Sequence, residues 1–255
     1  ALNTGGVERG VVEISKALVK NNFRSIVISS GGYMVSQVIR NGGIHYNLNI
    51  HTKNPFKWPK IRNQLKIILE NENVDLIHFC SRAPAWIGMP LGNVLDIPII
   101  TSVHMRFRRT NIFKKYYNSI LTKGNCIIAI SKHIEVCVKN SFPNVSDKIK
   151  IIHRGVDLDL FNPSQINPAR IIAQSKLLNL KDNLPVIIMA ARPAMWKGYV
   201  VLIKALSKIQ HDFQCILIGA GDGSQKFQNI LIKKIVQSNL ETKIKLVKST
   251  RDIQA

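Results

Sequence analysis

Short apolar runs rich in β-branched residues recur along the chain, each separated from the next by a stretch with helical periodicity. The candidate strands are residues 24–29, 74–79, 98–103, 126–130, 150–153, 186–190, 213–219 and 243–247. Most are continuously apolar, as is typical of parallel strands covered on both faces. The spacing also predicts two buried helix faces, one of Val7, Val11, Ile14 and Leu18 and one of Leu202, Ala205, Leu206 and Ile209. This alternation predicts an α/β fold with open parallel sheets.

The charge of the chain is strongly one-sided. Lysine and arginine number 36 against 15 acidic residues in 255, a formal net charge of +21. Such a balance predicts an anionic partner, which could be nucleic acid, a phosphorylated substrate or an acidic membrane. A hydrophobic content of 45% excludes disorder along the whole length, because the chain can bury enough apolar area to offset its ordering entropy.

The spacing of the cysteines and the length of the apolar runs indicate the cellular compartment in which the protein works. Cys80, Cys126, Cys137 and Cys215 are widely spaced, with no CxxC pair and no accompanying histidine cluster. Neither a disulfide framework nor a zinc site is expected, and a reducing cytosol fits best. The apolar runs are shorter than a membrane span, and the sequence shows no signal peptide.

Proline- and asparagine-containing turns interrupt the pattern between residues 161 and 185. Phe-Asn-Pro-Ser occupies 161–164, Asn-Pro occupies 167–168, and Asp-Asn-Leu-Pro at 182–185 opens the next strand. We therefore expect an N-terminal domain over residues 1–165 and a C-terminal domain over residues 166–255, the second with few strands.

Ligands of open α/β sheets bind beyond the carboxyl ends of the strands, and several candidate residues follow predicted strands. Arg192 would leave the strand 186–190 and Lys197 would enter a helix near its start, where both cations could hold a pyrophosphate. His104 closes the strand 98–103 and could contact a substrate hydroxyl. Two solvated surface cations and a structural histidine are the alternative interpretations.

Two glycine pairs could approach a phosphate closely. Gly5 and Gly6 lead directly into a helix, whose first amides are free to bind an anion. Gly219 and Gly221 follow the strand 213–219 but lack the full dinucleotide-binding pattern. An ordinary tight turn is the alternative interpretation of each pair.

Basic residues cluster beside large apolar ones in two places. One cluster holds Arg106, Arg108, Arg109, Lys114 and Lys115 around Phe107, Ile112 and Phe113, and the other holds Lys57, Lys60, Arg62 and Lys66 around Phe56 and Trp58. Cations next to apolar groups suit an acidic bilayer surface and would also suit nucleic acid. A solvated helix face is the third interpretation. No helix-turn-helix, RNP-like or zinc-finger pattern supports nucleic acid.

Taken together and in order, these segments resemble the GT-B glycosyltransferases of family 4, the retaining and nucleotide-sugar-dependent kind. The resemblance spans essentially the whole chain. It rests on Thr-Gly-Gly-Val-Glu at 4–8, Val-Asp-Leu-Ile-His at 74–78, Ser-Arg-Ala-Pro-Ala-Trp at 81–86, Thr-Ser-Val-His at 101–104, Ile-Ser at 130–131, Arg-Gly-Val-Asp at 154–157, Leu-Phe-Asn-Pro at 160–163, the stretch 192–198 and the glycine-rich 219–223. The Gly-Val-Asp and Arg-to-Lys-Gly stretches are the most specific.

The resemblance implies two Rossmann-like domains facing a cleft, the second of them incomplete here. It implies that Gly5 and Gly6 face the donor phosphates and the acceptor, that His104 approaches the transferred sugar, and that Arg192 and Lys197 bind the donor diphosphate and stabilise the leaving nucleotide. Gly219 and Gly221 would lie along the nucleotide. No metal and no cofactor other than the donor substrate is expected, because the family needs no DxD-type metal motif.

The resemblance also implies partners: a nucleotide-diphosphate sugar, a lipid-linked or glycan acceptor of the lipopolysaccharide type in the cell envelope, and an acidic membrane surface, with no nucleic acid. The expected location is cytoplasmic, peripheral at the inner face of the cytoplasmic membrane. A nucleotide-sugar epimerase of the same fold, a basic α/β nucleic-acid-binding protein and a non-catalytic remnant of a glycosyltransferase are the alternatives.

Two family features have no counterpart in these residues. The family carries two glutamates separated by seven residues in its C-terminal domain and a strand ahead of the Gly5–Gly6 loop, and neither occurs in the sequence. We therefore expect these residues alone not to catalyse sugar transfer, and we expect uncovered apolar faces on strands 186–190 and 213–219.

Overall fold

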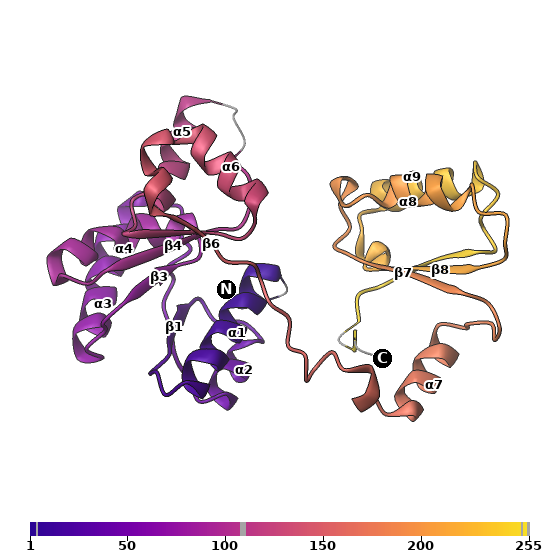
Figure 1. The fold of residues 1–255 in the computed structure, drawn as a ribbon, viewed down its shortest axis with the longest axis horizontal. Helices are drawn as coiled ribbons and strands as arrows, with labels where there is room; N and C mark the ends of the chain where they lie inside the picture. Colours follow the sequence, from indigo (N-terminus) through magenta and orange to yellow (C-terminus); the bar gives the residue numbers. More distant parts are fainter. Residues whose placement is uncertain (4, 108–110, 251, 254–255) are drawn as a thin grey trace. The chain divides into compact units, whose positions relative to one another are not determined.

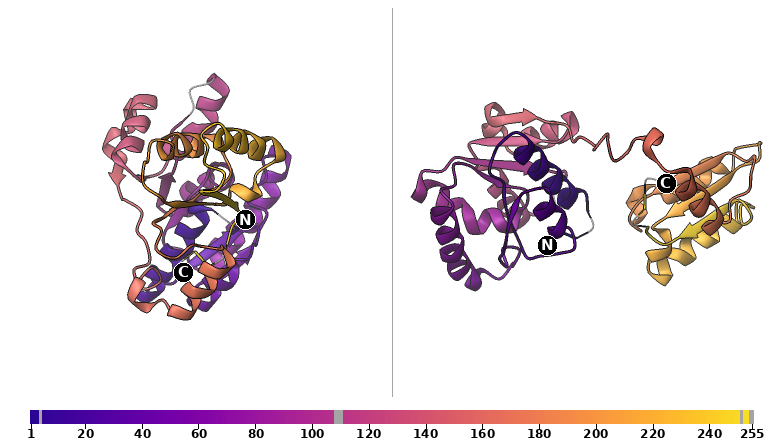
Figure 2. Two further views of the ribbon diagram at one scale, coloured as in Figure 1. Left: turned by 90° about the vertical axis from the view of Figure 1, so that its right-hand side faces the viewer. Right: turned by 90° about the horizontal axis from the view of Figure 1, so that it is seen from below.

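A computed structural model describes residues 1–3, 5–107, 111–250 and 252–253 of the chain. Within these residues the chain divides into two units, residues 1–156 and residues 157–255 (Figure 1), and Figure 2 shows the elements of each unit from two further sides. The sequence had predicted the boundary at 165/166. Each unit is described here by itself.

Unit 1 contains two parallel sheets. The first pairs β1 (Ile26–Ser29) with β2 (Ile44–Asn47), and the second has the order β3 (Ile77–Phe79), β4 (Ile99–Val103), β5 (Cys126–Ala129) and β6 (Ile149–Ile151). In the second sheet Ile100 lies opposite Cys126, and Ile127 lies opposite Ile149. The predicted parallel pairing is therefore confirmed, whereas β2 was missed, because its polar residues His45, Tyr46 and Asn47 hide the strand pattern.

Helices separate these strands along the chain. They are α1 (Gly6–Lys20), α2 (Val35–Arg40), α3 (Trp58–Asn71), α4 (Arg82–Leu95), α5 (Ile112–Ser119) and α6 (Lys132–Ser141), with short 3-10 turns η1 (Pro55–Lys57), η2 (Ile120–Thr122) and η3 (Pro143–Lys148). A large apolar core joins the second sheet to α3, α4 and α6, and a smaller core of Leu2, Val12, Val27, Met34 and Val38 holds the first sheet to α1 and α2.

The buried face of α1 differs from the predicted one. Val12 and Ser15 are buried, whereas Ile14 and Leu18 are exposed. The Ser25 hydroxyl donates to the Ser15 hydroxyl at 2.9 Å, so a polar contact fixes this face. The prediction used only the apolar residues of the helix, so it could not place Ser15 on the buried face.

Unit 2 is built on one parallel sheet of order β7 (Val186–Ala190), β8 (Gln214–Ile218) and β9 (Ile244–Val247). Figure 1 shows α8 (Tyr199–Leu206) and α9 (Gln225–Val236) over one face of the sheet and α7 (Pro168–Leu177) on the opposite side. The unit also has the 3-10 turns η4 (Pro163–Gln165), η5 (Met195–Lys197) and η6 (Ala220–Asp222). At the end of α7, the Lys245 ammonium donates to the carbonyl oxygens of Leu178 and Asn179, at 2.8 and 2.5 Å.

The prediction of uncovered apolar faces is confirmed for one strand of unit 2 and wrong for the other. On β7, Val186 and Ile188 are exposed. On β8, by contrast, Gln214 to Leu217 are all buried, because β8 lies between β7 and β9. The buried face of α8 also differs from the prediction: it consists of Tyr199, Ile203 and Leu206, with Ala205 exposed.

Truncating the core of the second sheet should destabilise unit 1. Ile127 is 0% exposed on β5, so Ile127→Ala should lower the free energy of unfolding by about 2–5 kcal/mol through lost burial and a residual cavity. Urea unfolding in a Trp196→Phe background follows unit 1 through Trp58 and Trp86. The matched control is Ile67→Ala on α3, where the side chain is 55% exposed and the change should stay within about 0.5 kcal/mol. Equal effects of the two substitutions would contradict the placement of the core.

Candidate functional site

Backbone hydrogen bonds bring the carboxyl ends of the three strands of unit 2 together. The Ala191 amide donates to the Ile218 carbonyl at 3.2 Å, and the Gly219 amide donates to the Val247 carbonyl at 2.9 Å. Gly219 has a φ of 87°, and a Cβ there would lie 2.4 Å from the Ala191 oxygen. A Cβ on Gly221 would lie 2.8 Å from the Lys248 nitrogen. Both glycines therefore permit close approach between loops, a packing reason that stands beside their predicted contact with the nucleotide.

Arg192 and Lys197 flank this edge of the sheet. Arg192 comes two residues after the end of β7, and Lys197 ends the 3-10 turn η5. The helix α8 begins at Tyr199, close to Lys197 as predicted, and Gly198 with a φ of 93° separates the turn from the helix. The Lys197 ammonium lies 4.5 Å from the centroid of the Trp196 ring. Trp196 is exposed, so it is not a core residue, and its ring contacts this lysine.

A buried tyrosine and a hydrogen-bonded aspartate fix the loops that carry the two cations. Tyr199 is fully buried against Phe227, and its hydroxyl donates to the Ala191 carbonyl at 2.6 Å, next to Arg192. Burial, followed by the Asp222 carboxylate, raises the pKa of Tyr199 and keeps it a neutral donor. The Asp222 carboxylate accepts from the Ser249 amide at 2.7 Å, and the hydrogen bonds of Ser249 lower the pKa of Asp222. The edge that carries Arg192 and Lys197 is therefore held by contacts that use neither cation.

Polar side chains gather at the carboxyl ends of β3 and β4 in unit 1. A hydrogen bond of 2.7 Å joins His78 Nε2 to Ser102 Oγ, and the Cys80 sulfur lies 3.8 Å from the same ring nitrogen. His104 follows β4 directly, and both of its ring nitrogens are buried without a hydrogen-bond partner among the residues that the structure describes. A buried imidazole with both nitrogens unused is available to a ligand hydroxyl.

His104 is neutral at physiological pH. Burial, the positive charge of Arg154 and the neighbouring His78 lower its pKa from 6.5 to about 4. A neutral imidazole carries one donor and one acceptor nitrogen, so it can either donate a hydrogen bond to a sugar hydroxyl or accept one from it. Burial also lowers the pKa of His78.

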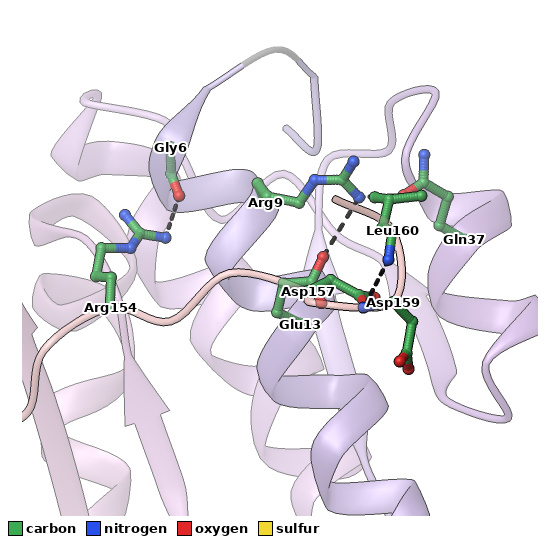
Figure 3. Close-up of polar contacts among 8 residues, drawn as sticks. All are labelled: Gly6, Arg9, Glu13, Gln37, Arg154, Asp157, Asp159 and Leu160. Atoms are coloured by element: carbon green, nitrogen blue, oxygen red, sulfur yellow. Dashed lines mark hydrogen bonds and ion pairs between the residues drawn. The ribbon is translucent and has the colours of Figure 1, made fainter. Parts of the chain in front are cut away.

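The N-terminus of α1 lies near this cluster. Gly5 is its N-cap, and the Glu8 carboxylate occupies the space that a Gly5 Cβ would take. The Arg154 guanidinium donates to the Gly6 carbonyl (Figure 3). His78, Cys80, Ser102 and Arg154 had no predicted role. The sequence could have identified all four residues, because each is a polar residue in or just after a strand that ends at this edge.

The structure joins the two basic clusters through aromatic rings. Trp86 of α4 stacks with Trp58 at a centroid distance of 6.2 Å and contacts Tyr116 of α5 at 5.1 Å. We call the region the aromatic–basic surface. Its exposed members are Phe56, Lys57, Lys60, Ile112, Phe113, Lys114, Lys115 and Tyr116. Phe56 is 92% exposed and Phe113 is 80% exposed, so large apolar groups stand in water beside lysines. Arg108 and Arg109 lie outside the described residues.

Two searches of the described residues concern metals and membranes. They hold no group of three or more His, Cys, Asp or Glu side chains arranged to bind a metal ion. None of the helices found in these residues has the length and apolar character needed to cross a bilayer. All four cysteines are free thiols.

Comparison with known proteins identifies the family. The sequence model of Glycosyltransferase Family 4 matches residues 4–160. Spore coat protein SA of Bacillus subtilis (strain 168) is 26% identical over 157 residues, which is 60% of this chain and 41% of that protein. The chain therefore spans less than half of that relative. The chain belongs to Glycosyltransferase Family 4, so the resemblance seen in the sequence is confirmed.

Solved structures agree on the fold. The crystal structure of a glycosyltransferase from Rickettsia africae ESF-5 is 34% identical, with a TM-score of 0.85, and the match covers 98% of this chain and 66% of that one. Anabaena Alr3699/HepE in complex with UDP-glucose is 19% identical, with a TM-score of 0.78, over 98% of this chain and 67% of that one. The units of this chain thus have the GT-B fold predicted from the sequence.

The pKa of His104 predicts how the stability of unit 1 depends on pH. The folded-state pKa of about 4 lies below the ordinary 6.5, so the unfolded chain takes up the proton first as the pH falls. The stabilisation is complete above about pH 6.5 and is lost as the pH falls through about 4, with His78 acting in the same direction.

Urea unfolding of unit 1 at several pH values tests this expectation. His104→Gln should flatten the decline in unfolding free energy between about pH 6.5 and pH 4. The control is His133→Gln, because His133 is exposed on α6. An unchanged slope in His104→Gln, or an equal change in both variants, would show that His104 is not held neutral by its surroundings.

Proposed function

We propose that the protein to which these residues belong is a hexosyltransferase, which moves a sugar from a nucleotide-diphosphate donor to an acceptor hydroxyl with retention of configuration. The acceptor we propose is a cell-envelope glycan or a lipid-linked saccharide of the lipopolysaccharide type. Because the chain covers only part of its relatives, this activity is proposed for the protein and is tested first at the level of donor binding.

The observation that carries the proposal is the edge of the unit 2 sheet. Arg192 and Lys197 lie on either side of a turn that Tyr199 and Gly219 fix to the ends of β7 and β8. Because these contacts fix the loops that carry the two cations, both charges lie on a stable edge where they can bind a diphosphate and stabilise a leaving group of growing negative charge. The family membership supports the same assignment.

Each predicted site residue has a role in this proposal. Arg192 and Lys197 neutralise the diphosphate of the leaving nucleotide, a task for which other transferases use a metal ion. In unit 1, the neutral His104 binds a hydroxyl of the transferred sugar, and the first amides of α1 at Gly5 and Gly6 face phosphate or acceptor groups. In unit 2, Gly219 and Gly221 let the backbone approach the nucleotide.

Substitution of the two cations tests donor binding. Arg192→Ala and Lys197→Ala should each weaken the binding of UDP by at least about tenfold, equivalent to ~1.4 kcal/mol, because each removes a charge-assisted contact. Isothermal titration calorimetry of the 255-residue chain measures this. Lys204→Ala is the matched control, since Lys204 is exposed on α8 and is not part of the turn.

The same chain distinguishes the proposal from a nucleic-acid-binding function. UDP-, GDP- or ADP-sugars should raise its thermal unfolding temperature, and a DNA duplex at equal phosphate concentration should not do so more strongly. Unchanged UDP affinity in both Arg192→Ala and Lys197→Ala would refute the assignment, and stabilisation by DNA alone would favour the other function.

We further propose that unit 1 binds acidic membranes through the aromatic–basic surface, at the inner face of the cytoplasmic membrane. Exposed Phe56, Ile112 and Phe113 can insert at the interface while the neighbouring lysines meet anionic headgroups, in agreement with the net charge of +21. Trp86 stacks with Trp58 and also contacts Tyr116, and these ring contacts support a single docking face in place of two separate ones.

Vesicle sedimentation tests the membrane proposal. Ile112→Ser with Phe113→Ser should lower binding to vesicles containing anionic lipid by at least about tenfold, since each buried large side chain contributes about 1.5–3 kcal/mol. The matched double variant is Ile171→Ser with Ile172→Ser on α7, two adjacent exposed isoleucines in unit 2, which should bind as the parent does. Equal binding of the parent to neutral vesicles, or binding to neither kind, would contradict the proposal.

A further inference from the structure

A glycine in the middle of α1 marks a notch on the helix surface. Gly10 lies inside a 15-residue helix, where glycine costs about 1 kcal/mol relative to alanine. A Cβ at Gly10 would lie 1.8 Å from Nη2 of Arg154, and a Cβ at Gly6, one helical turn earlier, would lie 3.5 Å from Nη1. The absence of side chains at these two positions therefore makes room for the Arg154 guanidinium.

Arg154 reaches this notch from the segment that follows β6. Its guanidinium donates to the Gly6 carbonyl, and Figure 3 shows the side chain reaching from this segment to the first turn of α1. In the part of the chain that the structure describes, no ion pair joins Arg154 to a carboxylate, Glu8 at the same end of α1 included. The residue is exposed, so its remaining N–H donors are accessible to a ligand.

The surroundings of Arg154 are polar groups from the same edge of the sheet. The charge of Arg154 contributes, after burial, to lowering the pKa of His104, and it opposes the burial that raises the pKa of Cys80. These effects require the guanidinium to lie near the ends of β3 and β4. The Arg154 guanidinium thus lies in the same site as the His104 imidazole, whose two ring nitrogens are buried and have no hydrogen-bond partner among the described residues.

We propose that Arg154, seated on Gly6 and Gly10, binds a phosphate oxyanion of the substrate whose sugar contacts His104. The inference rests on the proposed sugar transfer and adds to it a phosphate contact in unit 1 that is separate from Arg192 and Lys197. The planar guanidinium fork matches the geometry of phosphate oxygens. The N-terminus of α1, on which the guanidinium lies, adds free amide donors and the positive end of the helix dipole, and both favour an anion.

The missing counter-charge points to a ligand. The glycines under the guanidinium fix its position on α1. In that position Arg154 forms no ion pair within the described residues, and it lies near an imidazole, His104, whose ring nitrogens have no hydrogen-bond partner there. A phosphate supplies that charge, and it can come from the diphosphate of the donor or from a phosphate group on the acceptor.

The test uses the full 255-residue chain with UDP and with glycerol phosphate as probes, followed by calorimetry. Arg154→Gln should weaken the binding of at least one probe by about tenfold or more, because a charge-assisted fork is lost. Gly10→Ala keeps the charge but fills the notch, so it should weaken the same probe while leaving the helix at least as stable. Arg40→Gln is the matched control: Arg40 is an exposed arginine of unit 1 that donates to the Ser36 carbonyl at 3.3 Å, and its loss changes the net charge equally.

The pattern across probes identifies the source of the phosphate. Weaker UDP binding in Arg154→Gln identifies the donor diphosphate, and weaker glycerol phosphate binding with unchanged UDP binding identifies a phosphorylated acceptor. Unchanged binding of both probes overturns the inference, as does an equal loss in Arg40→Gln, which would mean that only the general positive charge matters. Thermal unfolding without ligand checks that each variant is folded.

The outcome is separable from that of the proposed function. Phosphate binding is measured without any sugar transfer, so a chain that transfers no sugar but loses phosphate binding in Arg154→Gln supports this inference alone. If Arg192→Ala and Lys197→Ala abolish UDP binding while Arg154→Gln affects neither probe, the donor assignment stands and the inference about Arg154 fails.

Discussion

Parallel pairing of the strands is the constraint on which both units depend. Neighbouring parallel strands point the same way, so their carboxyl ends meet at one edge, and a helix must return the chain between them. In unit 1 this brings together His78, His104 and Arg154, which come from the ends of three different strands. In unit 2 it places the Arg192–Lys197 turn beside the loop at Gly219. The chemistry of each unit is therefore assembled by topology from residues far apart in the sequence.

Close backbone approach is the second requirement, and glycine meets it at both edges. Gly219 allows the end of β8 to touch Ala191, the residue before Arg192. Gly10 allows the Arg154 guanidinium to lie directly on α1. In each case a side chain would occupy the space in which a cation or its supporting loop must lie, so the position of the charge depends on the absence of a Cβ.

Aromatic packing gives the charge of unit 1 its distribution. Trp86 contacts both Trp58 and Tyr116, so two basic segments separated by some fifty residues of chain belong to one surface. Its indole nitrogen donates to the Tyr117 carbonyl at 3.1 Å, which satisfies the polar end of a partly buried ring. On this surface, exposed lysines thus lie beside exposed apolar side chains.

The sequence by itself determined the α/β class, the family, the parallel pairing and most strand positions, because runs of apolar residues and glycine-bearing turns are local signals that each segment carries alone. It also named Arg192, Lys197 and His104, since residues that follow buried strands can be read from order along the chain. It misplaced the buried faces of α1 and α8, missed β2, and gave Arg154 no role. Only the tertiary structure decided these, because which face is buried and which side chain fills the notch at Gly10 depend on the partner that packs there, and that partner comes from a distant part of the chain.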